Sequence, residues 1–580
     1  MIKLNGAGGM GAKLGGVMKD GRKFGAIAVV LTVICLTAIW IIGMGEAVEK
    51  KEGQAEEYSS IFGYAKLFDM AALEISSKYV EDIDPKKIVY SGIKGMLGEL
   101  DPFSSLQDKE AHERFIEITQ GKYEGLGMAI GMRNGFIIVS STFEGSPAYR
   151  KGIRPGDKIL EIDGKSTQGM NTEDASQLMR GASGTTVKLQ IKREGLETPL
   201  EYEIERAIIE LKNVPYYGVV EDSIGYIRLS RFSEDSGKEL REAITDLNQR
   251  KIKGLILDLR NNGGGLLSQA VETSEMLLDK GKLVVYTKGR DEKQTIKYLA
   301  QAAPILPDKP LVVLVDEGTA SASEIVAGAV QDWDRGVIIG NNTYGKGLVQ
   351  QIFDLPMNAY IKLTVAKYYI PSGRCIQKPE MKNGANVVVD EQGQIQKLEQ
   401  KEKFYTKGGR LVFGEGGIAP DIQVEEEKLS PIQINLERKA AFFDFAVRYI
   451  GNHPDLPPNL EVDQKMLDDF KEFLKEINFT YQSPLEMELE SLKKSIQEEN
   501  VDTGFGSVLA NLENLVKKEK EKDFERSSDD IKNSIKRDIL FNLYGEKAYY
   551  EQILLKTDPY IKKGVEVLKD KKEYEKLLKS

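Results

Sequence analysis

Ser321 and Lys346 are the side chains that could together perform nucleophilic chemistry in this sequence. Ser321 follows the apolar run LVVLVD (311–316), and small residues lead from it into an apolar stretch that starts near Ser323. This pattern predicts a buried strand, a tight turn and a helix. A hydroxyl at such a turn lies beside a helix N-terminus, where backbone N–H groups and the helix dipole favour developing negative charge. Alternatively, these serines only cap the helix.

Lys346 lies between Gly345 and Gly347, shortly after the predicted strand GVIIG (336–340). A lysine can act as a general base only when it is neutral near the working pH, and burial favours the neutral amine by lowering its pKa. Flanking glycines would allow the backbone to approach a neighbouring turn closely. The other interpretation is a solvated loop lysine, which is the common environment of this residue type.

The segment GLILDLRNNGGGLL (254–267) predicts a strand, a glycine-rich turn and a following helix. Backbone N–H groups at such a turn can point at an anion, either the oxyanion of a reacting carbonyl or a phosphate. No lysine follows the glycines, so the segment does not match the phosphate-binding motif of nucleotide-binding proteins.

Composition excludes several other chemistries. The 580 residues include two histidines and two cysteines, and neither histidine lies near the three segments above. We therefore expect no histidine-based catalytic triad, no disulfide framework, no metal site and no cofactor. The net charge of −10 argues against nucleic-acid binding.

The three segments, in this order, resemble the C-terminal processing (tail-specific) peptidases. That family has its nucleophile as the first serine of S-A-S-E, a lysine twenty-five positions later and a glutamine four beyond it, and Ser321, Lys346 and Gln350 match this spacing. The resemblance implies that Ser321 attacks the scissile carbonyl, that Lys346 accepts its proton and that Gln350 orients the lysine. It also implies an oxyanion hole made by the amides of Ala322 and Gly264.

Two residues differ from the family's usual pattern, and two acidic residues match it. Cys375 replaces a usual serine, and Phe103 replaces a frequent histidine, but neither belongs to the expected machinery. Glu324 and Asp332 match recurrent acidic positions, to which we assign structural roles.

The segment 119–208 is rich in short alternating strands, and the family carries a PDZ domain at this place. Glycines before a strand in YEGLGM (123–128) could expose N–H groups to a terminal carboxylate, while the strand edge pairs with an extended peptide. The expected peptide-binding residues are Gly125, Leu126 and Gly127. The alternative is a β-rich spacer that binds nothing.

The expected fold is a multidomain α/β protein with a crotonase/Clp-protease-like catalytic core, an inserted PDZ-like domain, N-terminal helices and a C-terminal helical region. The expected divisions are an N-terminus at 1–23, a membrane anchor at 24–44, helices at 50–118, the PDZ-like domain at 119–208, the protease core at 209–428 with an insertion at 379–416, and charged helices at 429–580.

Residues 24–44 are apolar and about as long as a membrane-spanning helix. Five cations precede them, so the positive-inside rule predicts a single-pass anchor in the bacterial cytoplasmic membrane with the catalytic part outside. A cleaved signal peptide is the rival interpretation.

The sequence thus predicts a serine endopeptidase that recognises apolar C-terminal tails and processes or degrades envelope proteins. One alternative is a catalytically silent scaffold that binds tails, and another is a crotonase-like protein that binds an acyl thioester. The charged C-terminal helices leave self-association or adaptor docking open.

Overall fold

The computed structural model divides into two compact units, residues 1–99 and 100–580, each of which is described by itself. The residues that it describes are 52–221, 223–291, 293, 295–379, 381–382, 385–389, 395–397, 402–425, 428–498 and 505–579.

The first unit contains two helices in its described part, α2 (Glu52–Lys78) and α3 (Pro85–Gly98). Helix α3 begins where Asp84 accepts a hydrogen bond from Lys86 N at 2.9 Å and proline occupies the first turn. The ring of Phe68 on α2 packs so closely on Gly92 of α3 that a Cβ there would lie 2.6 Å from it. The predicted helical character of this region is confirmed.

The predicted membrane anchor requires correction. Residues 24–44 lie outside the described residues, and in the part of the chain that the structure describes no helix combines the length and apolar composition needed to cross a membrane. Helix α2 is long enough at 27 residues, but it carries Lys66, Asp69 and Glu74. The expected single-pass anchor, and the membrane location derived from it, are therefore not supported.

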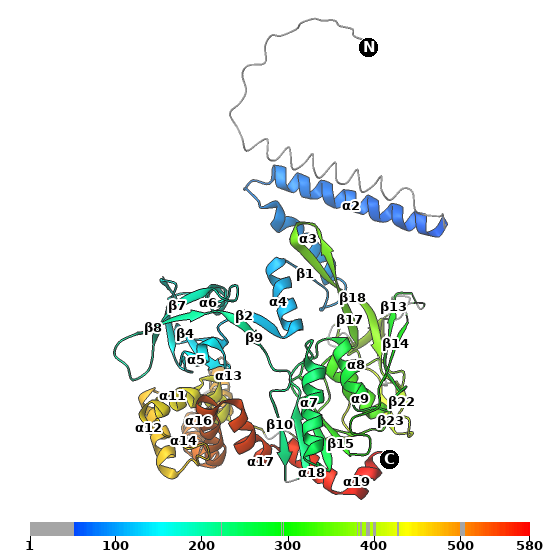
Figure 1. The fold of residues 1–580 in the computed structure, drawn as a ribbon. Helices are drawn as coiled ribbons and strands as arrows, with labels where there is room; N and C mark the ends of the chain where they lie inside the picture. Colours follow the sequence, from blue (N-terminus) through cyan, green and yellow to red (C-terminus); the bar gives the residue numbers. More distant parts are fainter. Residues whose placement is uncertain are drawn as a thin grey trace, which may run out of the picture. The chain divides into compact units, whose positions relative to one another are not determined.

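The second unit contains a six-stranded sheet, of which β10 and β15 are labelled in Figure 1. Its order is β10-β11-β12-β15-β16-β24, and every neighbouring pair from β11 onward is parallel. The strands are β10 (Tyr216–Val220), β11 (Ile224–Arg228), β12 (Gly254–Asp258), β15 (Leu311–Val315), β16 (Val337–Gly340) and β24 (Ile422–Gln423). The predicted α/β patterning with largely parallel strands is confirmed.

Helices α7 (Ser236–Gln249), α8 (Leu267–Glu275) and α9 (Ala322–Asp332) contribute to the core cluster on one face of this sheet. On α7 the buried residues recur every three or four positions, as Leu240, Ala243, Ile244 and Leu247. That spacing gives the helix one apolar face, which it buries against the strands.

A second sheet contains β1 (Ser105–Gln107), β13 (Leu283–Gly289), β14 (Ile296–Leu299), β17 (Leu348–Leu355) and β18 (Ala359–Tyr369). The sequence predicts a turn into a helix at 100–106, and the structure adds strand β1 there before α4 (Lys109–Gln120). Strand β1 is short and pairs with β18, so its conformation depends on a partner more than 250 positions away rather than on its own pattern.

The β-rich domain contains β3 (Met128–Arg133), β4 (Phe136–Thr142), β5 (Lys158–Ile162), β7 (Thr186–Lys192) and β8 (Leu200–Glu205) in that sheet order, with β6 (Lys165–Ser166) beside β5. Helices α5 (Pro147–Arg150) and α6 (Thr172–Met179) complete it, and the paired strands β2 (Lys122–Gly125) and β9 (Ala207–Glu210) flank it in sequence. The sequence Asn134–Gly135 predicts a β-hairpin, and the structure confirms it, because both residues have positive φ, 48° and 78°, as a tight two-residue β-turn requires.

Three small antiparallel pairings lie in the expected insertion at 379–416, between β19 (Met381–Lys382), β20 (Ala385–Val389), β21 (Ile395–Lys397), β22 (Lys403–Tyr405) and β23 (Leu411–Phe413). The hairpin character expected of this segment is therefore confirmed where the structure describes it.

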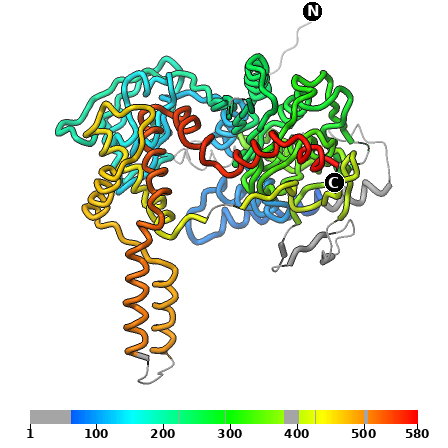
Figure 2. The backbone as a smooth tube through the Cα atoms, turned by 90° about the horizontal axis from the view of Figure 1, so that it is seen from below, coloured from blue at the N-terminus to red at the C-terminus, as the bar shows by residue number. Residues whose placement is uncertain are grey.

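The C-terminal region is helical, as predicted. Its helices are α10 (Pro431–Arg438), α11 (Ala441–Asn452), α12 (Gln464–Glu476), α13 (Pro484–Glu498), α14 (Phe505–Glu521), α15 (Asp523–Arg526) and α16 (Ser528–Tyr549). Figure 2 shows α13 and α14 side by side. Ile531, Ile535 and Ile539, members of the predicted apolar stripe on α16, are fully buried in the core of this domain.

The last helices belong to the same core as the six-stranded sheet. After a π-helical turn (Tyr550–Leu554) and α17 (Leu555–Thr557), helices α18 (Pro559–Lys569) and α19 (Lys571–Leu577) pack on the six-stranded sheet. Buried Ile561 and Val565 join Ile256 and Val312 in one cluster. The division expected at residue 429 therefore does not follow the packing, because the chain leaves the sheet and later returns to it.

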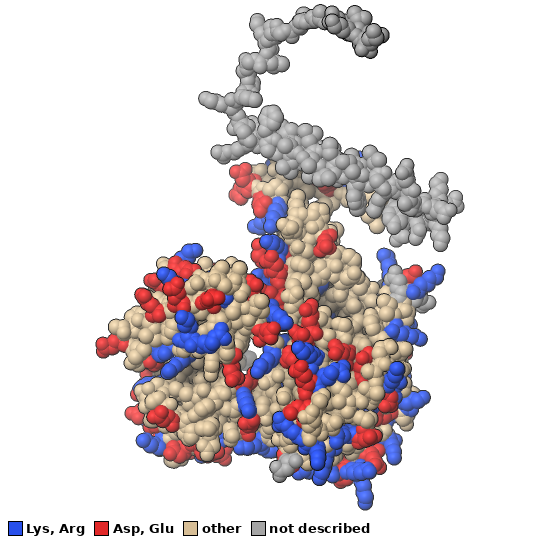
Figure 3. Space-filling model, in the orientation of Figure 1, with Lys and Arg blue, Asp and Glu red and all other residues tan. Residues whose placement is uncertain are grey.

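Acidic and basic side chains are interspersed on the face of the molecule that Figure 3 shows. On this face, neither sign of charge gathers over one large area.

Replacement of Ile561 by alanine should lower the free energy of unfolding of the catalytic core by about 2–5 kcal/mol, because a fully buried side chain is lost. Exposed Lys562 on the same helix is the matched control, and its replacement by alanine should change stability by less than about 0.5 kcal/mol. Urea unfolding followed by Trp333 fluorescence in a Trp40→Phe background measures both. Equal effects of the two substitutions would contradict the packing of α18 on the sheet.

Candidate active site

The carboxyl ends of three neighbouring parallel strands carry the three segments singled out by the sequence. The glycine turn follows β12, the serine turn follows β15 and the lysine loop follows β16. In open α/β sheets, sites form at this edge because the loops that leave adjacent parallel strands meet there. The fold therefore brings together segments that lie up to 85 positions apart in sequence, Asn261 to Lys346.

Ser321 lies in the tight turn between β15 and α9, at the N-cap of the helix. Its φ is 56°, a conformation that costs a non-glycine residue about 1–3 kcal/mol and persists only where its surroundings hold it. Among the contacts that hold this turn, Thr319 Oγ1 donates to Leu259 O at 2.9 Å, and Ala320 N donates to Asn262 O at 3.0 Å. The predicted strand, turn and helix are confirmed.

Gly264 lies directly against the serine turn. Its φ is 95°, and a Cβ at this position would lie 2.7 Å from Ala320 O and 2.9 Å from Ala322 N, so no larger residue fits. The amide of Gly264 donates to Asn262 Oδ1 at 2.9 Å. Ala322 is the first residue of α9, and amides of the first helical turn have no acceptor within their own helix. Of the two predicted oxyanion donors, Gly264 is thus engaged within its own turn.

Glu324 connects the serine turn to the lysine loop. One carboxylate oxygen, Oε2, accepts hydrogen bonds from Ser321 N at 2.7 Å and from Lys346 N at 3.0 Å. The other oxygen accepts from Thr343 Oγ1 at 2.5 Å and from Gly345 N at 2.7 Å. Since one atom receives both backbone amides, the main chains of Ser321 and Lys346 lie close together.

Tyr368 on β18 forms a second bridge between the same two segments. Its hydroxyl, which has one proton to donate, lies within hydrogen-bonding distance of two carbonyl oxygens, Ser321 O at 3.2 Å and Lys346 O. Tyr368 is 1% exposed, so these contacts are shielded from water. Glu324 therefore contacts the backbone amides of Ser321 and Lys346, and Tyr368 contacts their backbone carbonyls.

The side chains of the predicted catalytic residues are arranged differently from their backbones. The Lys346 amine lies over the Phe103 ring, 4.7 Å from its centroid. Gln350 Nε2 donates to Thr364 Oγ1 at 3.1 Å, and in the described part of the chain it makes no hydrogen bond to Lys346. A register shift in the pairing of β17 with β18 falls at Gln350, and such bulges redirect side chains.

The environment of Lys346 favours its neutral form. Burial lowers the pKa of the Lys346 amine below its usual value, and the positive charge of Lys362 lowers it further, while Glu324 and Asp101 act in the opposite direction. A lysine with a lowered pKa can accept a proton, which an ordinary surface lysine at neutral pH cannot.

Burial also raises the pKa of the Glu324 carboxyl group, to about 7. Its four hydrogen bonds act against this effect, since each stabilises the carboxylate.

Comparisons with protein families match three parts of the chain. The model of peptidase family S41 matches residues 223–387, the PDZ domain model matches 138–193, and a model described as a probable PDZ-protease C-terminal helical domain matches 432–568.

Two curated relatives resemble the chain over most of their length. The carboxy-terminal-processing protease of Bartonella bacilliformis is 36% identical over 403 residues, which cover 67% of this chain and 91% of the relative. The carboxy-terminal processing protease CtpA of Bacillus subtilis is 36% identical over 336 residues, covering 58% of this chain and 71% of the relative. The chain belongs to peptidase family S41.

The S41 peptidase is therefore a serine-type peptidase of mixed α/β fold with a PDZ domain and a C-terminal helical domain. A solved structure titled photosystem II D1 C-terminal processing protease is 28% identical and covers 61% of this chain and 86% of its own. Its TM-score of 0.35 is too low to carry a structural argument.

The predicted peptide-binding residues of the S41 peptidase lie in the segment that leads from β2 into the first strand of its PDZ domain, β3. Gly125 ends β2, and Leu126 and Gly127 connect it to β3, an edge strand of its sheet. Gly127 has a φ of 73°, and a Cβ there would lie 2.2 Å from Ser146 Cβ. The carbonyl of Leu126 accepts from Ala148 N at 2.9 Å, so the loop is pinned to the domain core.

Sequence reasoning on the S41 peptidase assigned Glu324 a structural role without identifying its partners, and it did not single out Tyr368. The capping-box pattern of Ser321 and Glu324 is readable, but it indicates only that Glu324 reaches the serine amide. Its bonds to the lysine loop, and the bridge by Tyr368, depend on tertiary structure and leave no local signal.

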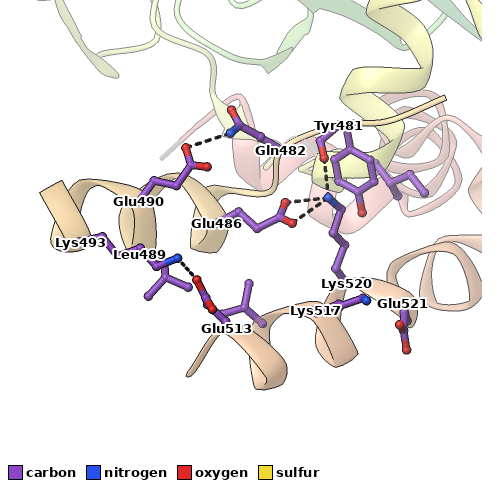
Figure 4. A pocket seen from close by; sticks show the side chains of 12 residues that line it. Tyr481, Gln482, Glu486, Leu489, Glu490, Lys493, Glu513, Lys517, Lys520 and Glu521 are labelled. Carbon is purple, nitrogen blue, oxygen red and sulfur yellow. Dashed lines mark hydrogen bonds and ion pairs between the residues drawn. The ribbon is translucent and has the colours of Figure 1, made fainter. Parts of the chain in front are cut away.

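A cavity of about 540 Å³ lies elsewhere in the S41 peptidase, between α13 and α14. Figure 4 shows Lys520 pointing at Glu486, which it contacts at 2.7 Å. None of the predicted catalytic residues lines this cavity.

Glu324→Gln should lower the rate of protein cleavage by about a hundredfold or more, since misplacing catalytic groups by an ångström has that effect. Each carboxylate oxygen accepts two hydrogen bonds, so the glutamine NH₂ must face two donors in either orientation. Each donor left unsatisfied also costs about 1–3 kcal/mol of stability.

Steady-state cleavage of an unfolded protein and thermal unfolding measure the two effects. Exposed Glu317, in the same turn, is the control, and Glu317→Gln should retain activity and stability. Wild-type activity in Glu324→Gln would show that the shared carboxylate is dispensable.

Proposed function

We propose that this S41 peptidase is a C-terminal processing endopeptidase, in which the PDZ domain holds a protein's C-terminal tail and a Ser321/Lys346 dyad cuts nearby peptide bonds. The observation that carries the proposal is the single Glu324 oxygen that accepts from both Ser321 N and Lys346 N. A hydroxyl in a strained turn and a lysine with a lowered pKa share this support. The names of the two relatives describe the same kind of activity for those proteins.

In the first step, Ser321 Oγ forms a bond to the scissile carbonyl carbon while its proton passes to the neutral Lys346 amine. The carbonyl π electrons move to the oxygen, and the resulting oxyanion is held by the amides of Ala322 and Gly264. Placement of Ala322 in the first turn of α9 supports this role, since the helix dipole also stabilises negative charge there.

In the second step, the tetrahedral intermediate collapses, the C–N bond breaks, and the Lys346 ammonium gives its proton to the leaving amine. This leaves an ester between Ser321 and the N-terminal part of the substrate. Lys346, neutral again, takes a proton from a water molecule that attacks the ester, and a second collapse returns the proton to Ser321 and releases the carboxylic acid.

Side-chain movement precedes these steps. The Lys346 amine must leave the Phe103 ring to reach Ser321, and Gln350 must exchange Thr364 for the lysine in order to orient it. The Gly264 amide must likewise exchange Asn262 Oδ1 for the oxyanion. The main chains of Ser321 and Lys346 already lie together through Glu324 and Tyr368, so the changes at Lys346 and Gln350 involve their side chains.

The tail would bind along β3, with its carboxylate at Gly125, Leu126 and Gly127. An edge strand can accept an added strand through backbone hydrogen bonds, and β3 is such an edge in its sheet. Apolar tails of precursor or damaged envelope proteins are the substrates that the family resemblance implies.

We further propose that the core, near residues 209–428, is crotonase/Clp-protease-like. The parallel strands β11, β12, β15 and β16, with helices packed on the sheet, support this class. We also propose that the PDZ-like domain ends and the protease core begins near residue 208, as the sequence predicts.

Purified full-length protein should degrade an unfolded protein with an apolar C-terminal tail, and Ser321→Ala or Lys346→Ala should abolish this cleavage. Amidation of the tail should raise KM and leave kcat nearly unchanged, since it removes the carboxylate but not the scissile bond. The matched control is Ser323→Ala, which removes a neighbouring hydroxyl that donates to Asn262 O. Full activity in either dyad variant would refute the dyad, and indifference to amidation would refute tail recognition.

The pH profile tests the proposed base. Activity should rise with pH, with a midpoint below the usual lysine value of 10.5, because the pKa of Lys346 is lowered. The positive charge of Lys362 is one cause of that lowering, so Lys362→Gln should raise the pKa of Lys346 and shift the rising limb to higher pH. Lys367→Gln is the control on the same strand. A profile that stays in place in Lys362→Gln, or moves to lower pH, would contradict the role of Lys346 as base.

A further inference from the structure

Two of the three catalytic loops begin at residues that contact the C-terminal helix α18. Arg260 lies just after β12 and directly before the glycine turn, and Asn341 is the first residue after β16, before the lysine loop. Their partners, Asp558 and Tyr560, lie almost 300 and about 220 positions further along the chain.

Helix α18 runs antiparallel to the strands that it covers. Leu568, near its end, packs on Gly254 at the start of β12, while Gly564 packs on Ile256 and Val312 in the middle of the sheet. The helix N-terminus therefore lies at the carboxyl edge of the sheet, where the catalytic loops begin. Figure 1 shows α18 close to β15 in the ribbon.

Asp558 both caps helix α18 and forms an ion pair with Arg260. Its Oδ1 caps the helix by accepting from Ile561 N at 2.9 Å, and its Oδ2 accepts from Arg260 Nη1 at 2.9 Å. The Arg260 and Asp558 side chains are 13% and 10% exposed, so water screens this ion pair little.

The rest of the Arg260 guanidinium is held by Asp258, through Nε to Oδ1 at 3.0 Å and Nη2 to Oδ2 at 2.7 Å. Burial alone would raise the pKa of Asp258, but Arg260 and Arg228 lower it to about 2, so this carboxylate stays charged. Asp258 therefore fixes Arg260 relative to the strand, and Asp558 fixes the helix relative to Arg260.

Tyr560 joins the two strand ends. Its ring lies 4.7 Å from the Arg260 guanidinium, and its hydroxyl is hydrogen bonded to the Asn341 side chain at 3.0 Å. In the amide orientation that satisfies both Asn341 atoms, Asn341 also donates to Val424 O and Gly340 O. One tyrosine thus contacts the residue before the glycine turn and the residue that starts the lysine loop.

We propose that Asp558 and Tyr560 are positioning residues of the peptidase, which hold the glycine turn and the lysine loop at the spacing that the reaction needs. This inference rests on the proposed Ser/Lys mechanism. The rest of α18 stabilises the sheet through apolar burial, whereas these two polar residues act at the edge where the loops begin. Their effect on the site passes through Arg260 and Asn341, the residues at the two strand ends that they contact.

The test uses Asp558→Asn and Tyr560→Phe in the full-length protein. Asparagine caps helices as well as aspartate does, so Asp558→Asn removes the charge facing Arg260 and preserves the helix start. Tyr560→Phe removes the bond to Asn341 and preserves the ring beside Arg260. We expect kcat for a tailed protein substrate to fall about tenfold to hundredfold, because small displacements of catalytic groups have effects of that size. KM should stay within about twofold, because the PDZ domain is unaltered.

Two matched controls separate positioning from stability. Asp570→Asn alters the cap of α19, where Asp570 accepts from Lys572 N and Glu573 N of its own helix. Tyr574→Phe removes a hydroxyl that is bonded to Leu311 at the start of β15, the opposite edge of the sheet. Both should leave kcat within about twofold, even where the melting temperature falls as much as in the Asp558 and Tyr560 variants.

The outcomes also distinguish this inference from the proposed mechanism. If Ser321→Ala or Lys346→Ala stays active, the mechanism itself fails. If those variants are inactive, but Asp558→Asn and Tyr560→Phe match their controls in kcat while folded, the positioning role is refuted. A fall in kcat that tracks only the loss of thermal stability across all four variants would refute it as well.

Discussion

A single buried carboxylate organises the candidate site. Glu324 is fully buried and receives four hydrogen bonds, from the serine turn and from the loop that carries the lysine. Buried polar groups must be satisfied, and a carboxylate has enough lone pairs to accept from several donors at once. This requirement joins segments that follow two different strands, and it keeps Ser321 in a conformation that is costly on its own.

The parallel sheet makes this arrangement available. Because β12, β15 and β16 are adjacent and point the same way, the loops after them emerge at one edge. The glycine turn can then approach the serine turn to within contact distance, which the absence of a side chain at Gly264 permits. The returning helix α18 covers the sheet face and carries a charged and an aromatic residue to the same edge. The catalytic core is therefore built from parts of the chain on both sides of the C-terminal helical domain.

The main chains of the proposed catalytic residues are already held together, whereas their side chains contact other partners. Glu324 and Tyr368 hold the main chains of Ser321 and Lys346 together, while the Lys346 amine rests on Phe103 and Gln350 is bonded to Thr364. The aromatic contact is worth only about 0.5–2 kcal/mol, so a bound substrate can displace the amine at modest cost. The scaffold thus holds the main chains in place, while the Lys346 and Gln350 side chains have contacts that the proposed mechanism requires them to exchange.

Much of the fold and the candidate residues could be read from local patterns. Apolar runs of β-branched residues marked the strands, Asn134–Gly135 marked a hairpin, and the spacing of Ser321, Lys346 and Gln350 marked the family, because each signal depends on neighbours in sequence. Strand β1 left no local signal, since it exists only through pairing with β18, and the division at 429 does not follow the packing, since α18 completes its burial on a distant sheet. The membrane anchor was inferred from composition alone and was not supported. The side chains that share a proton, a carboxylate or a ring face come from residues that lie tens to hundreds of positions apart in sequence, and tertiary contacts bring them together. Sequence alone therefore determined the residue types and the strands that carry them, and tertiary packing decided that Glu324, Tyr368 and Tyr560 connect those strands into one site.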